Sequence, residues 1–407
     1  MKLALGGALA TGCSRPRGRE ASSSRPRYWI LALLSGGHDT LYTTDPKTAT
    51  QVDQFVTLPT DNRVTQSAIP FGPHFAPLAA WADQLTVLNG IQVRTANHDT
   101  GQKQFFHLKT NINDGVPSVL DIIAAHRSTQ PLGVAYLNLS QRSMHSPAYF
   151  GTADRFYFGE GDVFDAISRA KPGELEHLQR VYAKRSDELM RKASGSREVQ
   201  QTAKYMREVS DFFAEVQHVP GLVPLERSND YVAQSMSETL ERALWLIQHD
   251  LCSGVVLDLG LLGWDSHFKN ESKQQEMSSN FVSYFNEFLQ QLHTRTNRFG
   301  PLASQTVTVV GSELGRFPHQ NDMLGKDHMP QTSFLFHGLP FRTGRVFGGT
   351  GTRMEGLGIS YRDGALANGG RVPLLDDVGT TMLEIAGIDP ERYGYTGRSC
   401  DFLLDRT

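Results

Sequence analysis

The sequence predicts an α/β protein built on a doubly wound, mostly parallel sheet with helices on both faces. Three observations indicate this class. Five short runs are apolar and rich in β-branched residues, helical patterns lie between and after them, and four of these runs end in segments that carry carboxylates or imidazoles. With 407 residues, 39% of them hydrophobic, the chain is long enough to bury the core of one large domain.

The strand candidates are short and largely apolar. Such runs are typical of strands buried on both faces, as in a parallel sheet. They lie at residues 28–34, 85–93, 253–262, 305–312 and 332–338.

The helix candidates carry apolar residues at intervals of three and four, and several begin at a serine that can cap the first turn. They lie at residues 74–85, 118–127, 237–251, 278–296 and 374–388. Alternation of strands and helices favours the doubly wound arrangement.

Residues 173–216 differ from the rest because they are strongly charged, with apolar stripes at helical spacing. Two amphipathic helices with solvated charged faces account for this pattern. We predict that they belong to a helical insertion at about residues 160–235. The glycine-rich stretch 346–373 predicts a long loop or hairpin.

The first 27 residues predict a signal of the lipoprotein type followed by a flexible tether. The stretch MKLALGGALATGC has one lysine, a short apolar region and Cys13, and the following Arg, Ser and Pro residues cannot bury apolar surface. We therefore expect an exported protein, periplasmic or anchored in a membrane through a lipid on Cys13, with a single α/β domain at 28–407. The alternative is a frayed terminus without a targeting role.

The bulk properties exclude several classes. A net charge of -3 provides no basic field for a nucleic acid. No apolar segment reaches the roughly 20 residues needed to cross a bilayer. No glycine-rich loop of the dinucleotide or Walker type is present.

Polar segments follow four of the strand candidates. In open α/β sheets the ligand crevice lies beyond the carboxyl ends of the strands, so these segments are expected to converge. A fifth segment, in a loop between two strands, carries a further aspartate and histidine. The side chains concerned are His38 and Asp39; His98, Asp99 and Thr100; Asp265 and His267; Glu313; and Asp327 and His328.

Mixed carboxylate and imidazole ligands indicate a metal site. The three cysteines form no CxxC pair, so a metal ion would be held by oxygen and nitrogen atoms. Zinc, manganese, magnesium and calcium accept such ligands, and the imidazoles favour zinc or manganese. One or two such ions suit the hydrolysis of a phosphate or sulfate ester. A single His-Asp pair is more often a turn, so the interpretation depends on the five segments together.

The same residues resemble a known family. Six short motifs occur in a fixed order between about residues 28 and 405: GGHD, NHDTG, WDSH, SELGRFP, GKDHMPQ and TGRVFGG. In this order they resemble the motifs of the family labelled domain of unknown function 1501, which belongs to the alkaline phosphatase and sulfatase superfamily. The resemblance implies an alkaline phosphatase-like fold and a metal-dependent hydrolase acting on a small anionic ester or on a sulfated or phosphorylated polymer.

The resemblance also implies roles for single residues. Asp39 would bind one metal ion and Asp265, His267 and His328 the other. Glu313 is expected to be a ligand, although Leu314 follows it where the superfamily has a histidine, so His319 is a possible replacement. Asp327 completes the expected ligand set.

Thr100 is the expected nucleophile, with His98 beside it as a catalytic group, and Arg316 and Lys326 are expected to contact the anionic substrate. Two other functions stay open: a catalytically silent surface protein that keeps the fold for binding or structure, and a metal-dependent transferase or mutase.

Overall fold

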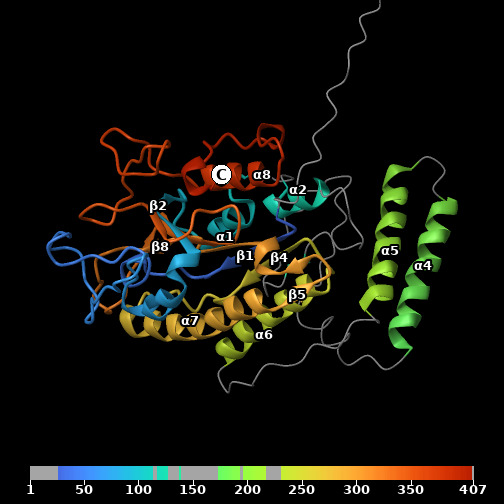
Figure 1. Cartoon of the computed structure of the whole chain (residues 1–407), viewed down its shortest axis with the longest axis horizontal. Helices are drawn as coiled ribbons and strands as arrows, with labels where there is room; N and C mark the ends of the chain where they lie inside the picture. The colour runs from blue at the N-terminus through green and yellow to red at the C-terminus, as the bar shows by residue number, and fades with distance from the viewer. Residues whose placement is uncertain are drawn as a thin grey trace, which may run out of the picture.

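The centre of the molecule is a seven-stranded sheet with the strand order β11-β2-β10-β7-β1-β4-β3 (Figure 1). A computed structural model describes residues 26–112, 117–126, 137–138, 173–192, 196–216 and 231–405. Within these residues the strands of the sheet are β1 (Tyr28–Leu33), β2 (Leu85–Gln92), β3 (Leu137–Asn138), β4 (Gly254–Asp258), β7 (Thr306–Gly311), β10 (Gln331–His337) and β11 (Arg345–Gly348). All five strand candidates are confirmed.

The sheet is parallel except at one strand. β1 runs parallel to β4 and β7, β3 to β4, and β11 to β2, whereas β10 is antiparallel to both of its neighbours, β2 and β7. The start of β10 therefore lies at the same edge as the carboxyl ends of the other strands. This is how the residues just before β10 reach the edge where the predicted site lies.

Both faces of the sheet are covered, as the apolar strand sequences predict. Successive side chains of a strand point to opposite faces. Ile30 and Ala32 of β1 accordingly belong to one buried core, and Leu31 and Leu33 to the other. The strand is completely buried because each face packs against helices.

The helices divide between these two cores (Figure 1). One core contains side chains of α6 (Tyr231–Gln248), α7 (Asn270–Thr294) and the 3-10 helix η2 (Pro73–Gln84). The other contains α1 (His98–His107), α2 (Val119–His126) and α8 (Leu375–Ile385). The doubly wound α/β class is therefore confirmed. The helix expected at 74–85 has 3-10 geometry, with Pro77 inside it.

The charged stretch forms two helices, α4 (Glu174–Lys192) and α5 (Arg197–Val216), which pack on each other. Ser186 Oγ of α4 donates to Ala203 O of α5 at 2.6 Å. The limits of the insertion stay a prediction because much of 160–235 lies outside the described residues.

Cys13 and the expected signal also lie outside the described residues. Cys252 and Cys400 are buried free thiols. None of the helices that the structure describes combines the length and the apolar character needed to span a membrane.

One element was not expected. α1 begins inside the stretch RTANHDTG, which is not among the helix candidates of the sequence. Asn97 caps the helix by accepting a hydrogen bond from Thr100 N at 2.9 Å. Small two-stranded pairs complete the structure: β5 (Thr296–Asn297) with β6 (Gly300–Pro301), and β8 (Gly315–Arg316) with β9 (His328–Met329).

The buried histidine at the end of β10 predicts acid sensitivity. Burial, with the nearby His293, lowers the pKa of His337 to about 3. In the unfolded chain this histidine has its ordinary pKa of about 6.5, so the unfolded state binds the proton more readily than the folded state. The free energy of unfolding is therefore unaffected above that pKa. It falls as the pH drops from about 6.5 toward 3. Between about pH 7 and pH 5 this histidine should cost about 2 kcal/mol.

Urea unfolding at these two pH values tests the expectation. His337→Gln should reduce the loss of stability on acidification, while His177→Gln, at an exposed position of α4, should leave it unchanged. An equal loss in both variants would contradict the assignment.

Candidate functional site

The turn after β1 packs directly against the segment that carries Asp265. Gly36 has φ +112°, a backbone conformation that favours glycine. A Cβ at this position would lie 2.4 Å from the backbone nitrogen of Asp265. The glycine therefore permits the close approach of two strand ends that are far apart in the sequence.

His98 is the first residue of α1 and is oriented by Glu313. Its Nδ1 lies 2.7 Å from Glu313 Oε1, and the Glu313 side chain is completely buried at the end of β7. Gly36 N donates to the same oxygen at 2.8 Å, and Ser312 Oγ donates to Oε2 at 3.0 Å. Glu313 thus joins β1, β7 and α1 at one point.

His328 reaches the same place through the β8 and β9 pair, in which it lies opposite Arg316. Its Nδ1 donates to the carbonyl oxygen of Ala96 at 2.6 Å. In the neutral ring this bond places the proton on Nδ1, and the Nε2 lone pair is then available to a metal ion, as in histidines that bind metals.

His267 is oriented in the same way. Its Nδ1 lies 3.1 Å from Asp327 Oδ1, and its Nε2 lies 2.9 Å from His328 Nε2. His267 is the most open of the three imidazoles, with 44% of its side chain exposed.

Asp265 lies between the three imidazoles. Its carboxylate is 3.5 Å from the Nε2 atoms of His98 and His328 and 3.3 Å from that of His267. We call these four residues the His/Asp cluster. Ligand atoms of His98, Asp265 and His328 all lie within 4.8 Å of one another.

The donor set fits a divalent metal ion. Three imidazole nitrogens and one carboxylate suit zinc or manganese, and each imidazole has an oxygen partner at Nδ1. His98 Nε2 is buried and has no hydrogen-bond partner. The Asp265 carboxylate lies 3.5 Å from this atom, and a divalent cation bound between the two groups would take the place of a proton on His98.

The electrostatics of the cluster are strongly coupled. Burial raises the pKa of Asp265, but the imidazoles of His328 and His98 and the charge of Arg316 outweigh it and hold that pKa well below its usual range. Burial lowers the pKa of His98, but Asp265 and Glu313 outweigh it and raise the pKa to about 9. Without a metal ion, His98 therefore carries a proton at neutral pH.

Arg316 lies beneath the cluster and not in the crevice. Its side chain is fully buried, and Nη2 contacts Asp265 Oδ1 at 2.9 Å. Nε donates to Gly37 O at 3.0 Å, Nη1 donates to Lys326 O at 3.0 Å, and Nη2 also donates to Gly36 O. All three nitrogens are engaged, so Arg316 holds the turn after β1 in place.

Asp39 is separate from the His/Asp cluster. Its Oδ2 accepts from Lys326 Nζ at 2.7 Å and from Asn270 Nδ2 at 3.0 Å, and its Oδ1 accepts from Leu41 N. Lys326 is completely buried and lies 4.6 Å from the centre of the Tyr42 ring. A lysine ammonium thus lies beside the carboxylate that the resemblance implied as a ligand of a first metal ion.

Several of the expected site residues bond to other groups of the protein. Glu313 and Asp327 lie beside the imidazoles of His98 and His267 and orient them. Arg316 and Lys326 are used inside the protein and not at the surface expected for substrate contact. His319 is exposed and bonded to Phe55 O at 2.9 Å, outside the cluster.

Thr100, the expected nucleophile, lies at the start of α1. It is exposed in the first turn of α1, two residues after His98. Residues two apart on a helix do not face each other, so Thr100 and His98 lie on different faces of α1.

Two residues that sequence reasoning missed support the turn from inside α7. Asn270 binds Asp39, and Gln274 accepts from Asp39 N at 2.8 Å while donating to Gly37 O at 3.1 Å. They are four apart and both completely buried. The signal available in the sequence was a pair of amides spaced to share one helix face.

The fold and the His/Asp cluster define an α/β protein with a candidate metal centre at the carboxyl edge of its sheet. Residues 27–405 match the family described as "Protein of unknown function (DUF1501)", and the chain belongs to that family. This confirms the resemblance seen in the sequence. Among curated proteins, none matches the chain.

Several solved structures resemble this one at low sequence identity. The lipoteichoic acid synthase LtaP from Listeria monocytogenes shares 8% identity, with a TM-score of 0.45 over 93% of this chain and 76% of that one. BT4656 in complex with D-glucosamine-2-N,6-O-disulfate shares 10%, with a TM-score of 0.42 over 94% and 80%. The alkaline phosphatase from the Antarctic bacterium TAB5 shares 10%, with a TM-score of 0.39 over 90% and 99%.

Proposed function

We propose that the protein is an exported hydrolase of sulfate or phosphate esters that uses one divalent metal ion, held by His98, Asp265, His267 and His328. The observation that carries the proposal is the convergence of three oriented imidazoles on one carboxylate. A divalent ion bound there would act as a Lewis acid toward an ester oxygen and make a water molecule acidic enough to attack at neutral pH.

The residues around the cluster have positioning roles in this proposal. Glu313 and Asp327 hold the rings of His98 and His267 and raise their basicity as ligands. Asp265 stays ionised over the physiological pH range, because its pKa is held low. Arg316 fixes one oxygen of Asp265 while its other bonds hold the glycine turn.

We infer that water, and not a side chain, attacks the ester. In the part of the chain that the structure describes, no hydrogen bond joins a serine or threonine hydroxyl to any of the four cluster side chains. The exposed Thr100 faces a different direction from His98.

Thr100→Ala should therefore keep its activity. We expect kcat/KM on the best ester substrate to stay within about twofold of the unmodified protein, since the hydroxyl is exposed and contacts no cluster residue. A loss of about a thousandfold or more would restore Thr100 as nucleophile.

The test of function is a panel of p-nitrophenyl sulfate, p-nitrophenyl phosphate and bis-p-nitrophenyl phosphate, assayed with zinc or manganese and again after chelation. We expect metal-dependent release of p-nitrophenol from at least one ester. Absence of both metal binding and turnover would overturn the proposal.

A catalytically silent binding protein is the second candidate. The observation that favours it is the internal use of both Arg316 and Lys326, which leaves neither cation for an anionic ester. Stoichiometric metal without turnover on the whole panel would support this alternative.

Export and lipid attachment through Cys13 belong to the same proposal. Cell fractionation after labelling with a fatty acid precursor tests them: the label should appear on the protein and disappear in Cys13→Ser. Unlabelled protein in the cytoplasm would contradict both.

A further inference from the structure

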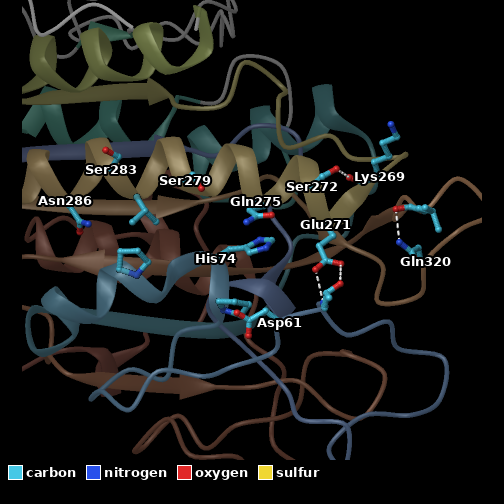
Figure 2. Close-up of a pocket in the computed structure, with 15 residues that line it drawn as sticks. Asp61, His74, Lys269, Glu271, Ser272, Gln275, Ser279, Ser283, Asn286 and Gln320 are labelled. Atoms are coloured by element: carbon cyan, nitrogen blue, oxygen red, sulfur yellow. Dashed lines mark hydrogen bonds between the residues drawn. The ribbon is translucent and has the colours of Figure 1, made fainter. Parts of the chain in front are cut away.

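A large pocket lies between α7 and the 3-10 helix η2 (Figure 2). Its volume is about 1000 Å³, at the upper end of the range for ligand sites. The loop at Thr60 and Asp61 lines it on one side, and Gln320 and Leu324 on another. None of its lining residues belongs to the His/Asp cluster.

The wall formed by α7 is a row of uncharged polar side chains. Their spacings of three and four residues place them on one face of the helix. They are Ser272, Gln275, Ser279, Ser283 and Asn286, and Figure 2 shows them along the helix where it borders the pocket. The four at 272–283 are exposed. The Ser272 hydroxyl donates to Lys269 O at 3.1 Å, so it can meet a ligand as an acceptor.

The opposite wall is formed by η2 and combines one imidazole with two proline rings. His74 is stacked on Tyr42, with ring centres 4.8 Å apart, which fixes the orientation of the imidazole. Pro73 and Pro77 provide flat apolar surfaces beside it. Such surfaces suit the apolar faces of sugar rings, while the polar row on α7 suits the hydroxyl groups at the ring edges.

Two polar atoms of the lining lack partners. His74 Nδ1 and Asn286 Oδ1 are buried and make no hydrogen bond. Burying a polar group without a partner costs free energy. A ligand hydroxyl can both donate and accept, so it can satisfy the amide oxygen as well as the imidazole nitrogen.

The charged groups of the pocket do not favour a strongly charged ligand. Asp61 pairs with Arg63 at 2.6 Å. Glu271 accepts from the backbone nitrogen and the hydroxyl of Thr60, both at 2.8 Å. Both carboxylates are therefore engaged, and Lys269 is the one cation among the lining residues.

We propose that this pocket binds a neutral oligosaccharide through the hydroxyl and amide row of α7 and the imidazole of His74. The site is distinct from the His/Asp cluster, although both are built from the segments 265–271 and 320–328. It makes no use of a metal ion, so binding there does not depend on ester hydrolysis.

The test is calorimetric titration of the full chain with cellohexaose, maltohexaose and chitohexaose. At least one should bind. The double variant Ser279→Leu with Ser283→Leu should weaken that binding at least tenfold, and so should His74→Phe, which keeps the stacking on Tyr42. The matched control, Glu276→Leu with Gln290→Leu, changes exposed positions of α7 outside the pocket and should bind as the unmodified protein does.

Asp265→Asn separates this inference from the proposed function. It should lose metal and turnover but keep saccharide binding. Thermal unfolding of each variant confirms that the chain is folded. Absence of binding for all three saccharides at millimolar concentration, or equal binding by the pocket variants and their control, would overturn the proposal.

Discussion

His328→Ala is expected to lose metal affinity and ester hydrolysis together, each by more than about 100-fold. Removal of a residue that only orients a ligand already costs about 10- to 100-fold. His328 is placed as a ligand, with Nδ1 fixed by Ala96 O and Nε2 directed into the cluster. The loss should therefore exceed that range.

Metal titration with a chromophoric competitor, together with kcat/KM on the best ester, measures both effects. Asp322→Ala is the matched control, because this exposed carboxylate belongs to the same loop but not to the cluster. Unchanged affinity in His328→Ala would contradict the assigned site.

Lys326→Met should lower the free energy of unfolding by about 3–5 kcal/mol, the largest stability effect that we expect from a single substitution here. Lys326 and Asp39 are both buried and 2.7 Å apart. Removing the ammonium leaves the Asp39 carboxylate buried with only hydrogen bonds from Asn270 and Leu41.

The double variant Asp39→Asn with Lys326→Met should recover part of this loss, since it removes the stranded charge. Lys184→Met, at an exposed position of α4, should change stability by less than about 0.5 kcal/mol. Urea unfolding of the four proteins provides the comparison. Equal stability of Lys326→Met and Lys184→Met would show that the pair contributes nothing.

The strands and the edge where the site lies were predictable from local pattern. An apolar run such as 28–34 has few alternatives to a strand covered on both faces. Asp265 and His267 follow a strand, and their spacing of two already suggested a shared ligand. These features depend on short stretches of sequence and on a general rule for open α/β sheets.

The partners of each side chain were not predictable in the same way. Asp39 and Lys326 are 287 residues apart, and only the three-dimensional packing brings a cation to this carboxylate. The roles of Glu313 and Asp327 depend on which nitrogen of a histidine faces them. A sequence lists them as carboxylates at a strand end or in a loop and does not separate ligands from residues that orient ligands.

The crevice position of His98 was predicted from its place after a strand, but the helix that holds it was not. Asn97 is a favourable helix cap, and an apolar stretch containing Phe105 and Phe106 follows it. These two signals could have located the start of α1 at His98. The antiparallel direction of β10, which brings His328 there, had no local signal.

Metal content at saturation tests the central claim most directly. The protein, loaded with zinc or manganese and freed of excess ion, should contain one ion per chain by elemental analysis, and Asp265→Asn should contain none. One ion is expected because, among the described residues, one cluster has ligand atoms close enough to share an ion, and Asp39 is paired with Lys326. Two ions per chain, or none after loading, would contradict this account.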